Sequence, residues 1–328
     1  MNPFVIIIPV LVLVLAVVFG GGYYAYRVAF YNNPKKRPAN PYRHIKDDGS
    51  AESEYSRRLI DEMIARQCEN VYITSHDGLK LRARLYIQNE NAPFVIGMHG
   101  YRSTPMLDFS GGGALSLKLG FNLLLPDQRA CGESEGRTVS FGYNESLDTL
   151  GWIKYISGRW GREREIILIG VSLGAGTVIM TAGRGVPDNV KGVIADCTFS
   201  SAKKIVMKVM GDRGYPRKPL YPLLRLGTLI YGRFDPNKAD PTVYAGGIKI
   251  PLMLVHGEGD DFVPPEMSRE IYGATDMAEL HTFPGARHGM SYIVDTERYE
   301  KATVEFLRRV LKQTDELNLE MKGDKNEA

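Results

Sequence analysis

The sequence predicts an α/β protein with an open, mostly parallel sheet and helices on both faces. Short apolar runs that end at turn residues are typical of buried parallel strands, and five occur: PFVIGMHG, FNLLLPD, EIILIGVS, VKGVIADC and IPLMLVHG. Amphipathic segments of helical length lie among these runs and beyond them, at about 110–119, 142–157, 174–184, 265–275 and 296–313. Such alternation favours a sheet that is covered by helices on both faces.

The chain begins with an apolar segment, residues 1–27, that predicts a transmembrane anchor. No charged side chain occurs from Met1 to Tyr26. A bilayer-spanning helix needs about 20 apolar residues, and Pro9 is tolerated in a membrane helix. A cleaved signal peptide is the alternative. That alternative calls for a basic start, a shorter apolar core and an A-x-A-like site, none of which is clear here.

Basic residues beyond the apolar segment predict its orientation. Only the α-amino group precedes the segment, whereas six basic residues follow it: Arg27, Lys35, Lys36, Arg37, Arg43 and Lys46. By the positive-inside rule we expect a single-pass protein of the cell membrane with its domain in the cytoplasm. Residues 28–66 form a polar linker that ends in a short helical stretch. The basic cluster NPKKRP could contact anionic headgroups, or simply be solvated.

The folded domain is expected to occupy residues 67–314. It opens with NVYITSHDGLKLRARLYIQ, whose alternating apolar residues around His76-Asp77-Gly78 predict a hairpin. Residues at about 199–248 separate two predicted strands, and their Met, Leu, Tyr and Pro content predicts a helical cap over the sheet edge. An ordinary crossover helix with a long entry loop is the alternative. Residues 315–328 are a polar tail.

The composition excludes several functional classes. The formal net charge is +3, so nothing indicates a nucleic-acid partner. The three cysteines, Cys68, Cys131 and Cys197, have no CxxC spacing and fit reduced thiols. The six histidines lack HxH or HExxH spacing, so we expect no metal site and no cofactor. The sequence does not indicate an oligomeric state.

The pentapeptide GVSLG places Ser172 between Gly170 and Gly174. The pattern G-x-S-x-G is short enough to arise by chance, but here a predicted strand precedes it and a predicted helix follows. That junction is the setting of a nucleophile elbow, in which a strained turn exposes the serine. The sequence therefore predicts that Ser172 is a nucleophile.

A serine hydroxyl needs a base that is held by an acid. Reactive groups gather at the carboxyl ends of parallel strands. Asp260 lies in the loop after IPLMLVHG, and His288 lies in a Gly-bounded loop after the short strand AELHTF. The order Ser172, Asp260, His288 is the Ser…Asp…His order of one fold type, so we expect Asp260 to be the acid and His288 the base.

Other acids and histidines compete for these roles. Asp261 adjoins Asp260, but consecutive loop residues usually point apart. Asp196 ends the strand in VIADC and could serve as an acid, although a cap for the following segment is the favoured role. We expect His256 to hydrogen-bond within its loop, and His281 and His99 to be structural.

A tetrahedral intermediate also needs two backbone N–H donors. The residue after the nucleophile, Leu173, supplies one in this arrangement. The loop after FVIGMHG supplies the other, and Tyr101 is the predicted donor there.

Five motifs together resemble the α/β-hydrolase superfamily: GMHGYRST, PDQRACGESEG, GVSLGAG, VHGEGDDFVP and GARHGMSY. They are most similar to bacterial membrane-anchored hydrolases of the serine aminopeptidase-like and monoacylglycerol-lipase-like branch, over roughly residues 68–313. The resemblance implies an α/β-hydrolase fold with the nucleophile, acid, base and N–H donors given above. The chain departs from the commoner D-x-R-G-x-G-x-S at Ala130, in a loop that we interpret as structural.

These observations predict a membrane-anchored serine hydrolase that cleaves an acyl ester or thioester through an acyl-enzyme. The expected partners are a small-molecule acyl substrate and the membrane. A peptidase or amidase that uses the same residues is one alternative. A catalytically silent membrane scaffold is another. Members of the superfamily include esterases, lipases, thioesterases and peptidases, so the resemblance implies the mechanism more strongly than the substrate.

Overall fold

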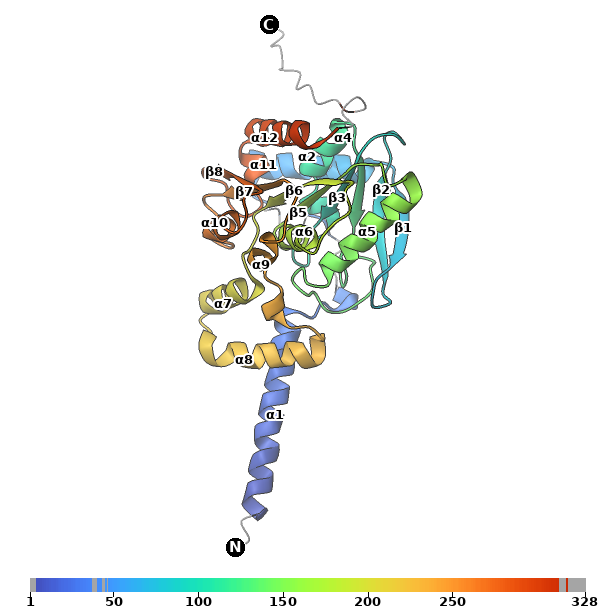
Figure 1. Ribbon diagram of the computed structural model, residues 1–328. Coiled ribbons are helices and arrows are strands. Elements are labelled where there is room, and N and C mark those ends of the chain that lie inside the picture. The colour runs from blue at the N-terminus through green and yellow to red at the C-terminus, as the bar shows by residue number, and fades with distance from the viewer. Residues whose placement is uncertain (1–3, 37–39, 43–44, 46, 313–316, 318–328) are drawn as a thin grey trace.

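The computed structural model describes residues 4–36, 40–42, 45, 47–312 and 317, and its centre is an eight-stranded sheet (Figure 1). The strand order is β1-β2-β4-β3-β5-β6-β7-β8. Strand β2 pairs antiparallel with β1 and β4, and all other neighbours are parallel. The strands are β1 Glu69–Thr74, β2 Lys80–Tyr86, β3 Phe94–Met98, β4 Asn122–Pro126, β5 Ile166–Val171, β6 Val190–Asp196, β7 Leu252–Gly257 and β8 Ala278–Phe283. The predicted hairpin and the mostly parallel sheet are confirmed.

Helices occupy each of the five segments that were predicted to be helical between or after strands: α4 Gly112–Lys118, α5 Glu145–Trp160, α6 Leu173–Gly183, α10 Glu266–Tyr272 and α12 Thr296–Val310. The helical stretch at the end of the linker is α2 Ala51–Ala65. Two short helices were not predicted: α3 Pro105–Asp108 and α11 Ser291–Val294. Each is a single turn or little more, too short for a hydrophobic period to register.

Alternate residues of β5 fill two separate cores, which explains why its sequence is continuously apolar. Ile166 and Leu168 pack into the core under α5 and α6, whereas Ile167 and Ile169 pack into the core under α4 and α12. Because side chains alternate along a strand, a strand covered on both faces has no polar side. Helices therefore cover both faces of the sheet, as predicted.

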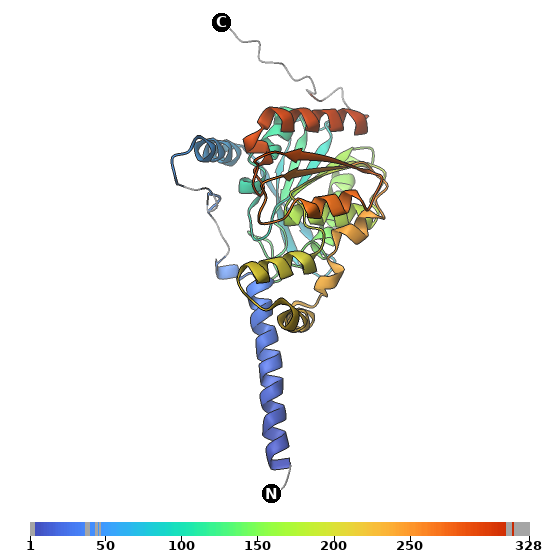
Figure 2. The same ribbon diagram turned by 90° about the vertical axis from the view of Figure 1, so that its left-hand side faces the viewer.

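The segment between β6 and β7 is helical, as expected for the cap. It contains α7 Ala202–Asp212, α8 Arg217–Gly227, a π-helical turn η2 Thr228–Gly232, a 3₁₀ turn η3 Pro236–Lys238 and α9 Pro241–Ala245. Both views place α7 and α8 between the sheet and the projecting length of the first helix, α1 (Figures 1 and 2).

Helix α1, Phe4–Ala29, is followed by the 3₁₀ turn η1 Pro34–Lys36. Its stretch Ile6–Ala29 has the length and composition of a membrane span, with a mean hydropathy of 2.6. A signal sequence meets the same criteria of length and composition. Of the predicted orientation signals, Arg37, Arg43 and Lys46 lie outside the described residues, as does all of the predicted polar tail except Leu317.

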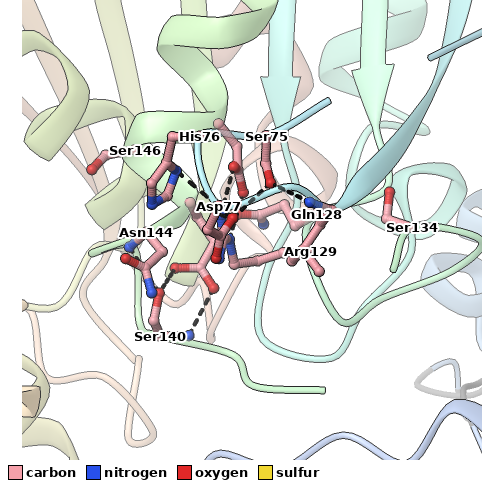
Figure 3. A network of polar contacts seen from close by, with 12 residues as sticks. Ser75, His76, Asp77, Gln128, Arg129, Ser134, Ser140, Asn144 and Ser146 are labelled. Atoms are coloured by element: carbon pink, nitrogen blue, oxygen red, sulfur yellow. Dashed lines mark hydrogen bonds and ion pairs between the residues drawn. The ribbon is translucent and has the colours of Figure 1, made fainter. Parts of the chain in front are cut away.

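Two ion pairs of the buried Arg129, one with the exposed Asp77 and one with the buried Asp148, hold the loop that carries PDQRACGESEG (Figure 3). Arg129 donates to Asp77 of the β1–β2 turn at 2.9 and 3.1 Å, and to Asp148 of α5 at 2.6 and 2.7 Å. Ala130, where the commoner motif has glycine, has φ +61°, a left-handed conformation that favours glycine. These contacts support the structural interpretation of the loop.

Candidate active site

Ser172 occupies a strained turn between β5 and α6. Its φ is +55° and its ψ −112°, a conformation that is rare for residues other than glycine. Gly170 and Gly174 make the turn possible because the chain crosses itself there. A Cβ on Gly170 would lie 2.2 Å from the carbonyl oxygen of Gly174, and one on Gly174 would lie 1.7 Å from that of Met98. The two glycines are thus required by close backbone packing.

We expect Gly174→Ala to lower the free energy of unfolding by about 1–3 kcal/mol or more, because the new methyl group must displace the Met98 carbonyl. Thermal unfolding of the full chain in detergent measures the effect. Gly158→Ala in α5 is the matched control, since Gly158 is an exposed helical glycine with open space around its Cα. The control should be neutral or slightly stabilising, and equal destabilisation by both substitutions would contradict the packing argument.

The predicted acid, base and nucleophile lie in one hydrogen-bonded chain. His288 Nε2 is 2.9 Å from Ser172 Oγ, and His288 Nδ1 is 2.7 Å from Asp260 Oδ2. Ser172 follows β5, Asp260 follows β7 and His288 follows β8, all at the carboxyl edge of the sheet. Sequence positions 172, 260 and 288 are therefore brought together at distances suited to proton transfer.

Four protein groups hold the Asp260 carboxylate. Its Oδ1 accepts hydrogen bonds from the backbone N–H groups of Phe262 and Val263, at 3.0 and 2.8 Å. Its Oδ2 contacts His288 and also His256, at 3.2 Å. Burial raises the pKa of Asp260, but the hydrogen bonds from His256 and His288 outweigh it and hold the pKa well below its usual value. The carboxylate therefore stays ionised and favours the His288 tautomer with its proton on Nδ1 and a lone pair on Nε2.

The competing residues occupy other positions. Asp261 is exposed, whereas Asp260 is buried. His256 lies within hydrogen-bonding distance of Val263 O and Ser268 Oγ in its own loop, as expected, and its contact with Asp260 was not predicted. His99 is fully buried, and its Nε2 accepts a hydrogen bond from Gln128 N at 3.0 Å. His281 lies on β8, with its Nε2 3.2 Å from Glu279 Oε1. Within the described residues, no group of three or more His, Cys, Asp and Glu side chains could hold a metal ion.

No protein acceptor is recorded in the described part of the chain for the backbone N–H groups of Tyr101 and Leu173. Leu173 begins α6, where the first N–H groups of a helix have no partner within the helix. Tyr101 follows Gly100, where a Cβ would lie 3.4 Å from the Ser172 Cβ. Tyr101, Ser172 and Leu173 line one cavity, and the roles of the two N–H groups as donors stay a prediction.

Two cavities meet at Ser172. An apolar cavity of about 450 Å³ lies on the cap side, and residues of α1 form part of its wall. A cavity of about 500 Å³ lies on the other side and includes His288, Asp108 and residues of α2. The sequence predicts an anchor and a linker for the segments that form α1 and α2. No sequence motif indicated their place beside the serine, because it depends on packing between distant segments.

Comparisons with known proteins agree with this fold. The family model described as "alpha/beta hydrolase fold" matches residues 107–225. A solved esterase of Pyrococcus furiosus is 25% identical, with a TM-score of 0.62 over 76% of this chain and 93% of the esterase. The chain has the α/β-hydrolase fold. The family segment includes the strained serine turn, and the eight-stranded sheet is the fold that the resemblance implied.

Curated relatives of this chain match shorter stretches. The uncharacterized protein YqkD of Bacillus subtilis (strain 168) is 27% identical over 195 residues, which span 59% of this chain and 64% of that protein. The thiohydrolase aneE of Aspergillus aculeatus is 33% identical over 109 residues, 32% of this chain and 34% of that protein. Membership of a particular branch of the superfamily stays a prediction.

The buried carboxyl of Asp196 is expected to make the free energy of unfolding depend on pH. Burial raises its pKa to about 6, and its Oδ1 has no hydrogen-bond partner. A carboxyl whose pKa is raised on folding stabilises the fold below about pH 4 and loses that contribution as the pH rises through about 6. We expect Asp196→Asn to gain about 3 kcal/mol in free energy of unfolding relative to wild type between pH 4 and 7.5. Thermal unfolding of both proteins across this range measures the difference, and a constant difference would contradict the raised pKa.

Proposed function

We propose that this chain is a membrane-anchored serine hydrolase that cleaves acyl esters or thioesters, with Ser172 as nucleophile, His288 as base and Asp260 as acid. The observation that carries the proposal is the chain of two short hydrogen bonds, 2.9 and 2.7 Å, that ends on a serine in a strained turn. Strain of this kind is stored at functional sites, where surrounding structure enforces it. The esterase and thiohydrolase among the similar proteins support the choice of bond.

The proposed reaction has two steps. Ser172 Oγ attacks the acyl carbonyl carbon while His288 Nε2 takes its proton, and Asp260 stabilises the imidazolium that forms. The N–H groups of Tyr101 and Leu173 stabilise the negative oxygen, and His288 gives its proton to the departing oxygen or sulfur. Water then attacks the acyl-enzyme with His288 again as base, which releases the acid and restores Ser172.

The test is labelling of the full chain with a fluorophosphonate probe, which phosphonylates an activated serine. Wild type should label, and Ser172→Ala should not. Ser201→Ala is the matched control, because Ser201 is a buried serine whose hydroxyl caps α7. Equal labelling of wild type and Ser172→Ala would show that the nucleophile is misassigned.

We also propose that α1 spans the cell membrane and that the domain faces the cytoplasm. The basic residues that follow the helix support this orientation. The last turns of α1 pack into the domain through Tyr26 and Phe30, which favours a retained anchor over a cleaved signal.

Cys68 offers a direct test of orientation, because it is exposed while Cys131 and Cys197 are buried. A membrane-impermeant maleimide should leave intact cells unlabelled and label Cys68 after permeabilisation. A Cys68→Ser variant identifies the labelled site. Labelling of Cys68 in intact cells would place the domain outside.

A further inference from the structure

The apolar cavity beside Ser172 is walled in part by the membrane helix itself. Five residues of α1 line it: Gly21, Tyr24, Ala25, Val28 and Ala29. Their spacing is i, i+3, i+4, i+7 and i+8, which is one face of an α-helix. At 1.5 Å per residue this face extends for about 12 Å. The cap contributes the facing wall from α7 and α8, and Ser172 and Leu173 also line the cavity.

The neighbouring face of α1 is fixed to the domain. Gly22 and Tyr26 are buried there, and so is Phe30, which directly follows the helix. The Phe30 ring lies 5.3 Å from that of Phe141 and 5.4 Å from that of Phe234, and the Tyr26 hydroxyl lies 2.7 Å from the Thr138 hydroxyl. The final turns of α1 therefore belong to the folded domain as well as to the membrane segment.

The end of α1 is also hydrogen-bonded to the loop that carries a proposed oxyanion donor. The Tyr101 hydroxyl donates to the Ala29 carbonyl at 2.8 Å. The Arg102 guanidinium donates to the carbonyls of Val28 and Tyr31, at 3.2 and 2.6 Å. These bonds satisfy carbonyls that a helix end leaves without partners, and they fix the position of α1 relative to the reacting serine.

Helix α8 crosses α1 with its backbone in contact, and Figure 1 shows it lying nearly across the axis of α1. A Cβ on Gly227 would lie 1.9 Å from the Gly22 carbonyl oxygen. Glycine at such a crossing is typical of helices that pack closely in membranes. Beyond the crossing, an exposed apolar patch is formed by Leu226, Leu229, Ile230 and Tyr231.

This patch lies beside the part of α1 where its long exposed apolar run ends. The Tyr231 ring is 5.0 Å from that of Tyr23, and its hydroxyl donates to the Phe19 carbonyl at 3.4 Å. A helix lying across a membrane span, with apolar residues exposed next to it, is suited to the bilayer interface. The cavity is open to the surface near this patch, because three residues of its lining are 46–68% exposed: Tyr24, Val28 and Tyr215.

We propose that the substrate is an acyl ester dissolved in the bilayer, and that its acyl chain enters the cavity along the face of α1 to reach Ser172. The proposal rests on the serine hydrolase function above and assigns its substrate class. Helix α1 is then part of the substrate site, and Ala25 and Val28 help to set the acyl-chain length that the site accepts.

The test uses the full chain in phosphatidylcholine vesicles with two probes, p-nitrophenyl butyrate and p-nitrophenyl palmitate. Ala25→Trp fills the cavity along α1. It should lower kcat/KM for the palmitate ester by about tenfold or more and change the butyrate ester by about twofold or less. Ala16→Trp is the matched control, because Ala16 is an exposed alanine of the same helix outside the cavity, and it should leave both values unchanged.

Val28→Trp is a second variant, at an exposed position of the cavity wall, for the case that Ala25→Trp does not fold. It should also lower the ratio of palmitate to butyrate hydrolysis. Fluorophosphonate labelling of Ser172 verifies that each variant has an intact site. An unchanged ratio of palmitate to butyrate hydrolysis, or parallel loss of both, in the variants that label would overturn this inference alone. A wild-type protein that hydrolyses neither ester would overturn the proposed function and this inference together.

Discussion

His288→Ala is expected to lower kcat for ester hydrolysis by about 10³- to 10⁶-fold, since it removes the group that takes the Ser172 proton at 2.9 Å. A serine hydroxyl without its base is a weak nucleophile at neutral pH. Initial rates on p-nitrophenyl butyrate measure the loss. His281→Ala is the matched control because His281 lies on β8 beside Glu279, away from the hydrogen-bonded chain, and it should retain wild-type rates.

The double variant Ser172→Ala, His288→Ala sharpens this prediction. Residues that act as one unit are not additive, so the double variant should be no slower than either single variant by more than a few-fold. Losses that multiply would mean that Ser172 and His288 contribute independently, which contradicts a shared proton transfer. A loss in His281→Ala equal to that in His288→Ala would reassign the base.

The fold could be predicted because its strands are signalled locally. A strand covered on both faces is mostly apolar, so β3, β4, β5, β6 and β7 each contain a short uninterrupted apolar run in the sequence. The single-turn helices α3, α9 and α11 carry no such signal. In α3 and α9 the start of the helix is set by a side-chain cap: the Thr104 hydroxyl accepts from Leu107 N, and the Asp240 carboxylate accepts from Val243 N.

The candidate site could be predicted as far as chain order and strand ends determine it. Ser172, Asp260 and His288 follow β5, β7 and β8, whose carboxyl ends lie at one edge of the sheet. The contact of His256 with Asp260 could not be predicted, because it depends on how the loop from Gly257 to Val263 folds back. The place of α1 in the cavity wall depends on its crossing with α8, some 200 residues later in the chain, which no local pattern reveals.

Asp260→Asn is expected to lower kcat by about 10⁴-fold while leaving the protein folded. The Asp260 carboxylate accepts from His288 Nδ1 at 2.7 Å, and its pKa is held well below the usual value, so it favours the tautomer with a free Nε2 lone pair. An amide in its place can donate to Nδ1 instead. The ring then carries its proton on Nε2 and cannot take the proton of Ser172.

Asp261→Asn is the matched control for this substitution, since it makes the same change one residue along the loop, on an exposed side chain. We expect Asp261→Asn to keep wild-type kcat, and initial ester hydrolysis rates at pH 7.5 measure both variants. Asp196→Asn tests the remaining acid and should also stay active. If Asp196→Asn loses activity while Asp260→Asn keeps it, the acid is on β6, and the 2.7 Å contact of His288 with Asp260 would be structural only.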